Sequence, residues 1–224
     1  MAYRRTENVV RRLTARKDAI VAAAQAVAAE GGMAAIQIAA ISARADIATG
    51  TIYRYFPGKT ELLGALIASI SEREVAAVQR AADAAPGPLS ALAAAVATFA
   101  ARAVRHRRLT YALIAEPVDA DVDVIRLTYR RSLAAEFTAR IQTAIDGGHL
   151  PGQNAALAAP AIVGAVLEGL IGPLAPEGAD DPAKMRDAVQ MLTLFALRAL
   201  GVVDAHARGI VVQTVLPANE EAAA

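Results

Sequence analysis

Apolar residues recur at three- and four-residue spacing along most of the chain, and no alternating strand pattern persists. Ile20, Ala24 and Val27 mark one face of a helix that we place at residues 12–29, ended by two glycines. Similar patterns and caps predict further helices at 59–84, 89–104, 109–116, 121–146, 154–175 and 181–200. The segment GIVVQTVL near the C-terminus is expected to be a short extended piece. The fold class is therefore all-α.

Residues 37–56, QIAAISARADIATGTIYRYF, form a compact unit within this series. Ile38 and Ile41 face inward on a first short helix, and Ile52 and Phe56 face inward on a second. Two such helices joined by a turn of three or four residues make a helix-turn-helix. With Ile52 and Phe56 turned inward, the rest of the second helix is polar, neutral to basic and open to a partner.

Charge is distributed unevenly around this unit. Residues 1–60 hold nine Lys and Arg against four Asp and Glu, whereas the remainder holds fourteen against eighteen. A basic end on an acidic body indicates a polyanionic partner at one end. Thr49 suits a thymine methyl or a phosphate, and Arg54 suits a guanine edge or a phosphate. Tyr53, Tyr55 and Lys59 suit phosphate oxygens, so double-stranded DNA is the expected partner.

The stretches IVAAAQAVAAEGG and ISARADIATGTIYRYFPGKTELL resemble the DNA-binding domain of the tetracycline-repressor (TetR) family, over about residues 15–65. The resemblance implies a three-helix DNA-binding domain, followed by a helical body that binds an effector and forms a dimer. By this resemblance the predicted DNA contacts are Gln37, Ala48, Thr49, Gly50, Thr51, Tyr53, Tyr55 and Lys59, to which the reasoning above adds Arg54. Basic residues of the N-terminal arm add phosphate contacts.

Three residues depart from the family pattern. Asp46 stands at the usual turn glycine, and aspartate tolerates a left-handed backbone better than most residues. Ala48 replaces the usual serine at the start of the recognition helix, which removes a cap worth roughly 1 kcal/mol unless Thr49 serves instead. Gln37 replaces a threonine that contacts phosphate in the family. The turn is thus the least ordinary part of the unit.

We divide the chain into an arm and helix-turn-helix domain at 1–58 and an effector-binding and dimerisation domain at 59–224. The homodimer is expected to form through residues about 154–200. An apolar run covers 155–167, but it is shorter than the roughly 20 residues that a membrane span needs. It therefore predicts a buried or interfacial helix and no membrane contact.

The effector is expected to be small and hydrophobic, in a mainly apolar pocket between helices 89–104, 109–116, 121–146 and 154–175. Arg126, Arg130, Glu116 and His106 are candidates for polar recognition, although Arg126 and Arg130, four residues apart, are also typical of a solvated helix face. The predicted ligand contacts are Phe99, Tyr111, Ile114, Arg126, Tyr129, Val163 and Leu167.

Enzymatic chemistry finds little support in the residues. The chain has no cysteine, its three histidines lack metal-ligand spacing, and neither a phosphate-binding glycine loop nor a nucleophile turn is present. We predict no catalytic residue, no metal and no cofactor, and a cytoplasmic location. The interpretation is a dimeric repressor released from a palindromic operator by its effector. The alternative is a non-enzymatic helical protein that binds nucleic acid or anionic surfaces non-specifically.

Overall fold

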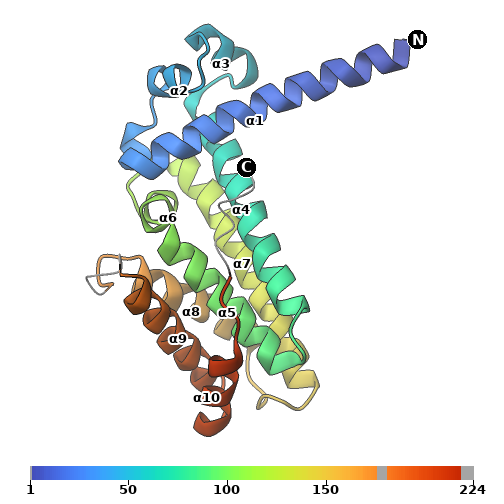
Figure 1. Ribbon diagram of the computed structural model, residues 1–224, viewed down its shortest axis with the longest axis vertical. Helices are drawn as coiled ribbons and strands as arrows, with labels where there is room; N and C mark the ends of the chain where they lie inside the picture. Colours follow the sequence, from blue (N-terminus) through green and yellow to red (C-terminus); the bar gives the residue numbers. More distant parts are fainter. Residues whose placement is uncertain (1, 176–180, 218–224) are drawn as a thin grey trace.

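The computed structural model describes residues 2–175 and 181–217, which form ten helices and no strand (Figure 1). The predicted all-α fold is confirmed. The helices are α1 (Ala2–Ala35), α2 (Ile38–Arg44), α3 (Thr49–Tyr55), α4 (Lys59–Asp83), α5 (Pro88–Arg105), α6 (Arg107–Ile114), α7 (Ala120–Asp146), α8 (Ala155–Leu170), α9 (Pro182–Ala199) and α10 (Asp204–Gln213).

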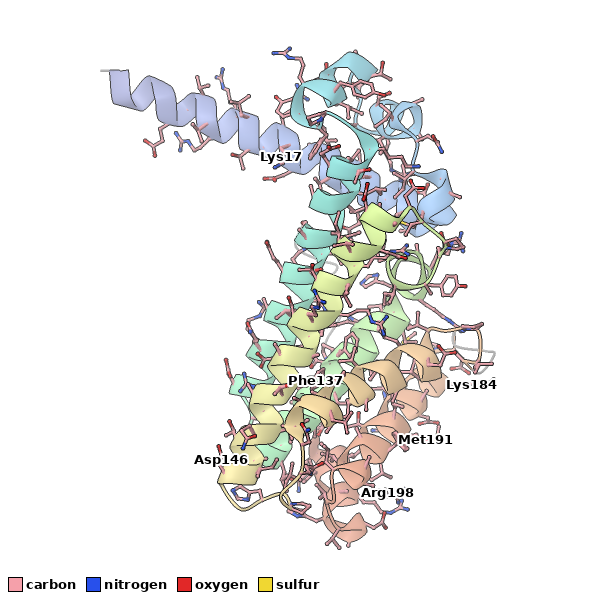
Figure 2. The ribbon with its side chains drawn as sticks, turned by 180° about the vertical axis from the view of Figure 1, so that it is seen from behind. Lys17, Phe137, Asp146, Lys184, Met191 and Arg198 are labelled. Carbon is pink, nitrogen blue, oxygen red and sulfur yellow. The ribbon has the colours of Figure 1, made fainter. Side chains whose placement is uncertain are left out.

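The helices α2 and α3 lie at one end of the molecule, and the first half of α1 projects beyond them (Figure 1). Below them α4 and α7 run side by side along the body, and α8 to α10 cover the other side of α5. The helix α5 packs against α4, α7, α8 and α9 because its residues are small or apolar nearly all round. Phe99 on α5 meets Phe137 on α7 with ring centroids 6.2 Å apart, and both side chains are buried. Figure 2 shows Phe137 within the body.

Two helix predictions were wrong. The first helix begins at Ala2 instead of residue 12, because residues 2–19 contain neither glycine nor proline and need no packed face to be helical. Of the segment expected to be extended, residues 209–213 are helical and belong to α10, where Ile210 and Val211 are buried, while residues 214–216 follow the end of the helix. The β-branched side chains of Ile210 and Val211 favour strands weakly, and packing against α5 and α9 overrides that preference.

The division of the chain after residue 58 stays a prediction. The helix α4 contacts α1 as well as α5 and α7, and α1 contacts α6. Buried residues from Ile20 to Val211 form one hydrophobic cluster. The N-terminal helices and the body are therefore packed on a shared core, which allows a change in one to reach the other.

The turn between α2 and α3 places Asp46 in the left-handed region, with φ 50°. We predict that Asp46→Gly raises the free energy of unfolding by roughly 0.5–1 kcal/mol, because glycine has no Cβ to approach the neighbouring carbonyl. Chemical denaturation monitored by circular dichroism measures the change. The control is Ala45→Gly, where φ is −83° and glycine should lower stability. Equal losses in both variants would contradict the prediction.

Candidate nucleic-acid interface and effector cavity

The predicted recognition helix α3 has one buried face and one open face. Ile52 is fully buried and Phe56, at the C-terminal end of α3, is 3 % exposed, so these two residues form the inward face of a helix that packs against α2. Tyr53 is 53 % exposed, and Arg54 is also exposed. A Cβ added to Gly50 would meet no atom within 4 Å, so the backbone there is open to a close partner.

All nine residues predicted to contact DNA lie at this end of the molecule, on α3 or at the starts of α2 and α4. Thr51 and Tyr55 are half-buried, and the remaining seven are exposed: Gln37, Ala48, Thr49, Gly50, Tyr53, Arg54 and Lys59. The exposure of these seven residues is a geometric condition that DNA contact requires. Contact itself stays a prediction.

Neither short helix has a side-chain cap at its start. Ala48 precedes α3 and Gln37 precedes α2, and neither side chain accepts a hydrogen bond from the first turn. The Gln37 amide instead donates to the carbonyl of Ala34 at 3.2 Å. The α3 start therefore lacks the stabilisation of roughly 1 kcal/mol that serine provides, and Thr49 does not replace it.

The projecting part of α1 adds positive charge beside α3. Residues 7–19 are all exposed, and they include Arg11, Arg12, Arg16 and Lys17. The Lys17 ammonium lies 5.6 Å from the centre of the Phe56 ring, which joins α1 to the end of α3. The basic arm predicted from the sequence is thus part of the helix α1.

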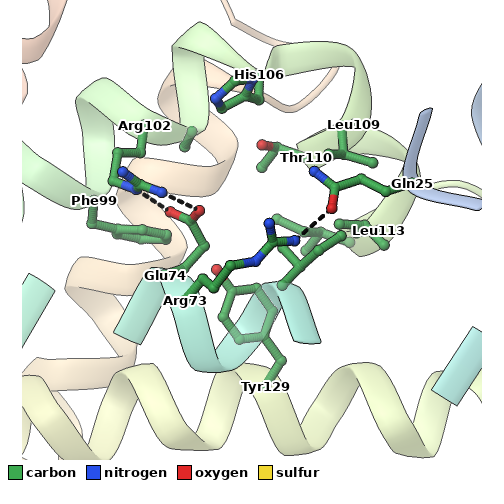
Figure 3. A pocket seen from close by; sticks show the side chains of 13 residues that line it. Gln25, Arg73, Glu74, Phe99, Arg102, His106, Leu109, Thr110, Leu113 and Tyr129 are labelled. Carbon is green, nitrogen blue, oxygen red and sulfur yellow. Dashed lines mark hydrogen bonds and ion pairs between the residues drawn. The ribbon is translucent and has the colours of Figure 1, made fainter. Parts of the chain in front are cut away.

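A cavity of about 110 Å³ lies in the body between α1, α4, α5, α6 and α7 (Figure 3). Its apolar wall includes Phe99, Leu109 and Leu113, and its polar wall carries a two-pronged ion pair. In that pair Arg102 donates to the Glu74 carboxylate at 2.7 and 2.9 Å. The lining residues are Gln25, Ile70, Arg73, Glu74, Phe99, Arg102, Ala103, His106, Leu109, Thr110, Leu113, Ile114 and Tyr129.

This lining differs from the predicted pocket in two ways. Phe99, Ile114 and Tyr129 line the cavity as expected, and His106 is the predicted polar candidate that reaches it. Tyr111, Arg126, Val163 and Leu167 do not line this cavity, and their contact with an effector stays a prediction. Val163 and Leu167 are instead buried, because α8 packs on α7.

Sequence reasoning missed the walls supplied by α1 and α4. Gln25 on α1 accepts a hydrogen bond from Arg73 on α4, and both side chains line the cavity (Figure 3). No sequence signal distinguishes these two polar side chains from those of a solvated helix face. The cavity therefore touches the first helix of the predicted DNA-binding unit directly, and its wall is more polar than expected. Burial, followed by the negative charge of Glu74, raises the pKa of Tyr129, so its hydroxyl stays protonated.

Arg126 does not lie on a solvated face, which corrects the second expectation for this residue. It is 5 % exposed, and its guanidinium donates to the carbonyls of Glu116 and Ala112, both at 2.6 Å. These carbonyls lie at the end of α6, where helical partners are lacking. Arg126 therefore fastens the end of α6 to α7. Burial lowers the pKa of Arg126, and Asp123 partly opposes this change.

A second fastening joins α6 to α1. The Glu116 carboxylate accepts a hydrogen bond from the Met33 amide at 2.6 Å and pairs with Arg108 at 3.3 Å. Gly32 lies beside it with φ 74°, and a Cβ at this position would collide with the Glu116 carboxylate. Glycine is thus required at this break in α1 by both backbone conformation and space.

Within residues 2–175 and 181–217, side chains of His, Asp and Glu do not gather into a group that could hold a metal ion. Across the same residues, each helix is too short or too polar to cross a membrane.

Comparison with known proteins gives a family match at the helix-turn-helix. Residues 20–66 match the model of the bacterial regulatory proteins of the tetR family. The HTH-type transcriptional repressor KstR of Mycolicibacterium smegmatis is 39 % identical over 106 residues, which are 47 % of this chain and 52 % of the relative. KstR of Rhodococcus jostii is 47 % identical over 58 residues, 26 % of this chain and 27 % of the relative. The chain spans about half the length, or less, of the curated relatives it matches.

Solved structures extend the likeness to the whole fold. RolR in complex with resorcinol has a TM-score of 0.66 at 22 % identity, covering 93 % of this chain and 98 % of RolR. The fatty acid degradation regulator FadR from Bacillus halodurans has a TM-score of 0.71 at 19 % identity, covering 84 % of this chain and 97 % of FadR. At these identities the likeness concerns the fold alone, and the family assignment rests on residues 20–66 and the KstR relatives. The helix-turn-helix region of the chain, within residues 20–66, is thus similar in sequence to that of the tetR family of bacterial regulatory proteins.

Proposed function

We propose that this chain is a cytoplasmic, dimeric transcriptional repressor that binds a palindromic operator through α3 and is released by a small effector. The observation that carries the proposal is the two-sided character of α3. Ile52 and Phe56 are buried, while Thr49, Tyr53 and Arg54 stand exposed at the basic end of the molecule. A helix of this kind fits the major groove, where small and hydrogen-bonding side chains reach base edges.

The dimer is proposed to form through α8 and α9, within the predicted 154–200. On α9 the apolar side chains of Met191 and Phe195, four residues apart, are 65 and 55 % exposed, and Figure 2 shows Met191 on the outer side of the body. Leu157 on α8 is 70 % exposed. Large apolar side chains gathered on neighbouring helices favour an interface between copies. Val163 and Leu167 support it from within, since both are buried.

The effector is proposed to be compact and amphipathic. An engineered apolar cavity of about 150 Å³ holds benzene, so a cavity of about 110 Å³ suits at most a single ring without expansion. Resorcinol, the ligand in the RolR structure, is a compound of this size. The Glu74 and Arg102 pair offers both an acceptor and a donor beside the Phe99 ring. The sequence indicated a hydrophobic effector, and this charged wall favours one that also carries polar groups.

Two variants distinguish a side chain that contacts a base from one that contacts the phosphate backbone. We predict that Arg54→Ala lowers discrimination between the operator and a mismatched duplex by about 1–3 kcal/mol, because Arg54 contacts a base edge. Lys59→Ala should weaken binding to all duplexes alike and reduce the slope of log affinity against log salt by about 1. Fluorescence anisotropy with an operator selected from random duplexes measures both quantities.

The matched control is Arg80→Ala, which removes an exposed arginine near the far end of α4 and should leave both quantities unchanged. Equal wild-type affinity for every duplex would contradict operator recognition and favour the non-specific alternative. If Arg54→Ala changes the salt slope and Lys59→Ala changes discrimination, the two roles are exchanged.

The dimer interface is tested by Phe195→Glu. A buried, unpaired carboxylate at the interface is costly, so we expect this variant to be a folded monomer at micromolar concentration. Light scattering after size-exclusion chromatography measures the mass, and circular dichroism checks the fold. Val212→Glu on α10 is the control, because Val212 is 81 % exposed and lies outside the proposed interface. A dimeric Phe195→Glu variant would refute the assignment.

A further inference from the structure

A second hollow lies on the surface where α6 meets α7, with a volume of about 480 Å³. We call it the α6–α7 crevice. Its apolar wall is formed by Ile114, Pro117, Val118 and Leu127, and its charged side chains are those of Glu116, Asp123, Arg126 and Arg130. Ile114 also lines the internal cavity, so this residue separates the two spaces.

Carboxylates neutralise the positive charge of the crevice only in part. Arg126 is 5 % exposed, and its one carboxylate contact is Asp123 at 3.3 Å, whose side chain is 67 % exposed. The Arg126 Nε–H is buried without an acceptor. A buried guanidinium normally has its hydrogen bonds filled and a carboxylate well placed against it. Arg126 therefore has one donor, the buried Nε–H, that the contacts fastening α6 leave unused.

Arg130 lies one helical turn from Arg126 and provides a second, accessible cation. It is exposed, and its side chain makes no hydrogen bond or ion pair with any described residue. Of the two carboxylates in the crevice, Glu116 is already engaged by Arg108 and the Met33 amide. Because Glu116 is neutralised from outside the crevice by Arg108, the two arginines of the crevice share only the exposed carboxylate of Asp123, and this balance favours an incoming negative charge.

We propose that the α6–α7 crevice is a binding site for a small organic carboxylate, distinct from the internal cavity. The carboxylate lies against Arg130 and Arg126, and the apolar part of the molecule covers Pro117, Val118 and Leu127. Arginine favours such an arrangement because its planar guanidinium matches the geometry of a carboxylate. An inorganic anion would leave the apolar wall exposed to water and gain less.

A ligand in the crevice can affect DNA binding because the crevice lies beside the contacts between α6 and α1. Arg126 donates to the carbonyl of Glu116, and the carboxylate of the same residue holds the Met33 amide in α1. A ligand that draws on Arg126 therefore changes the group that fastens the body to the N-terminal helices. This effect rests on the proposed function, whereas binding of the carboxylate does not.

The test uses benzoate as the probe and the full chain without DNA. Isothermal titration calorimetry and thermal denaturation should show binding of benzoate at millimolar concentration and weaker binding of benzamide, its uncharged analogue. We expect Arg130→Ala to weaken benzoate binding by at least about fivefold, because a charge-assisted contact is lost. The matched control is Arg131→Ala, the neighbouring exposed arginine, which is not part of the crevice and should leave the affinity unchanged.

The variant Arg73→Ala distinguishes binding in the crevice from binding in the internal cavity, because Arg73 lines the internal cavity and does not line the crevice. Loss of benzoate binding in Arg73→Ala with normal binding in Arg130→Ala would overturn the proposal, as would equal affinity for benzamide. Absence of benzoate binding to the wild-type chain would overturn it too. Operator release by benzoate is measured separately, so a chain that binds benzoate but no operator refutes the proposed function and leaves the site intact.

Discussion

The hydrogen bond from the Met33 amide to the Glu116 carboxylate fastens the end of α6 to α1, beside the apolar packing of α1 against α4 and α6. It is 2.6 Å long and partly buried, and the carboxylate also pairs with Arg108. Hydrogen bonds to a charged group contribute about 1.5–3 kcal/mol, although partial exposure reduces this. Gly32 makes the contact possible, since any larger residue would occupy the space of the carboxylate. Without this contact α1 and α6 would meet through apolar packing alone, which is less specific in direction.

The short helix α6 is held at its end from two sides. Arg126 on α7 binds its last carbonyls, and Glu116, just beyond it, binds α1. The same helix supplies Leu109, Leu113 and Ile114 to the internal cavity. A ligand in the cavity and a ligand in the crevice would both act on α6, and each can shift its position only by binding one arrangement better than another. A ligand in either space would therefore act through the same helix, α6.

The helical pattern was largely readable from the sequence, with errors where packing did not follow local preference. Apolar spacing located α2 to α9 within a few residues, because each of these helices buries one face. The first half of α1 carries no buried face, and so its helix left no apolar spacing to read. In α10 the β-branched pair of Ile210 and Val211 suggested an extended segment. These residues are helical instead, because the helix buries both side chains against neighbouring helices.

The sequence by itself determined the helix-turn-helix, because its signals are local: Ile52 and Phe56 are four residues apart, and Asp46 tolerates the left-handed turn. It also indicated which side chains of α3 remain open. Only the tertiary structure decided the walls of the cavity and the roles of Arg126 and Glu116. These depend on residues from α1, α4, α6 and α7 that meet across long stretches of chain, and an arginine on a helix has the same local pattern whether it faces water or a neighbouring carbonyl.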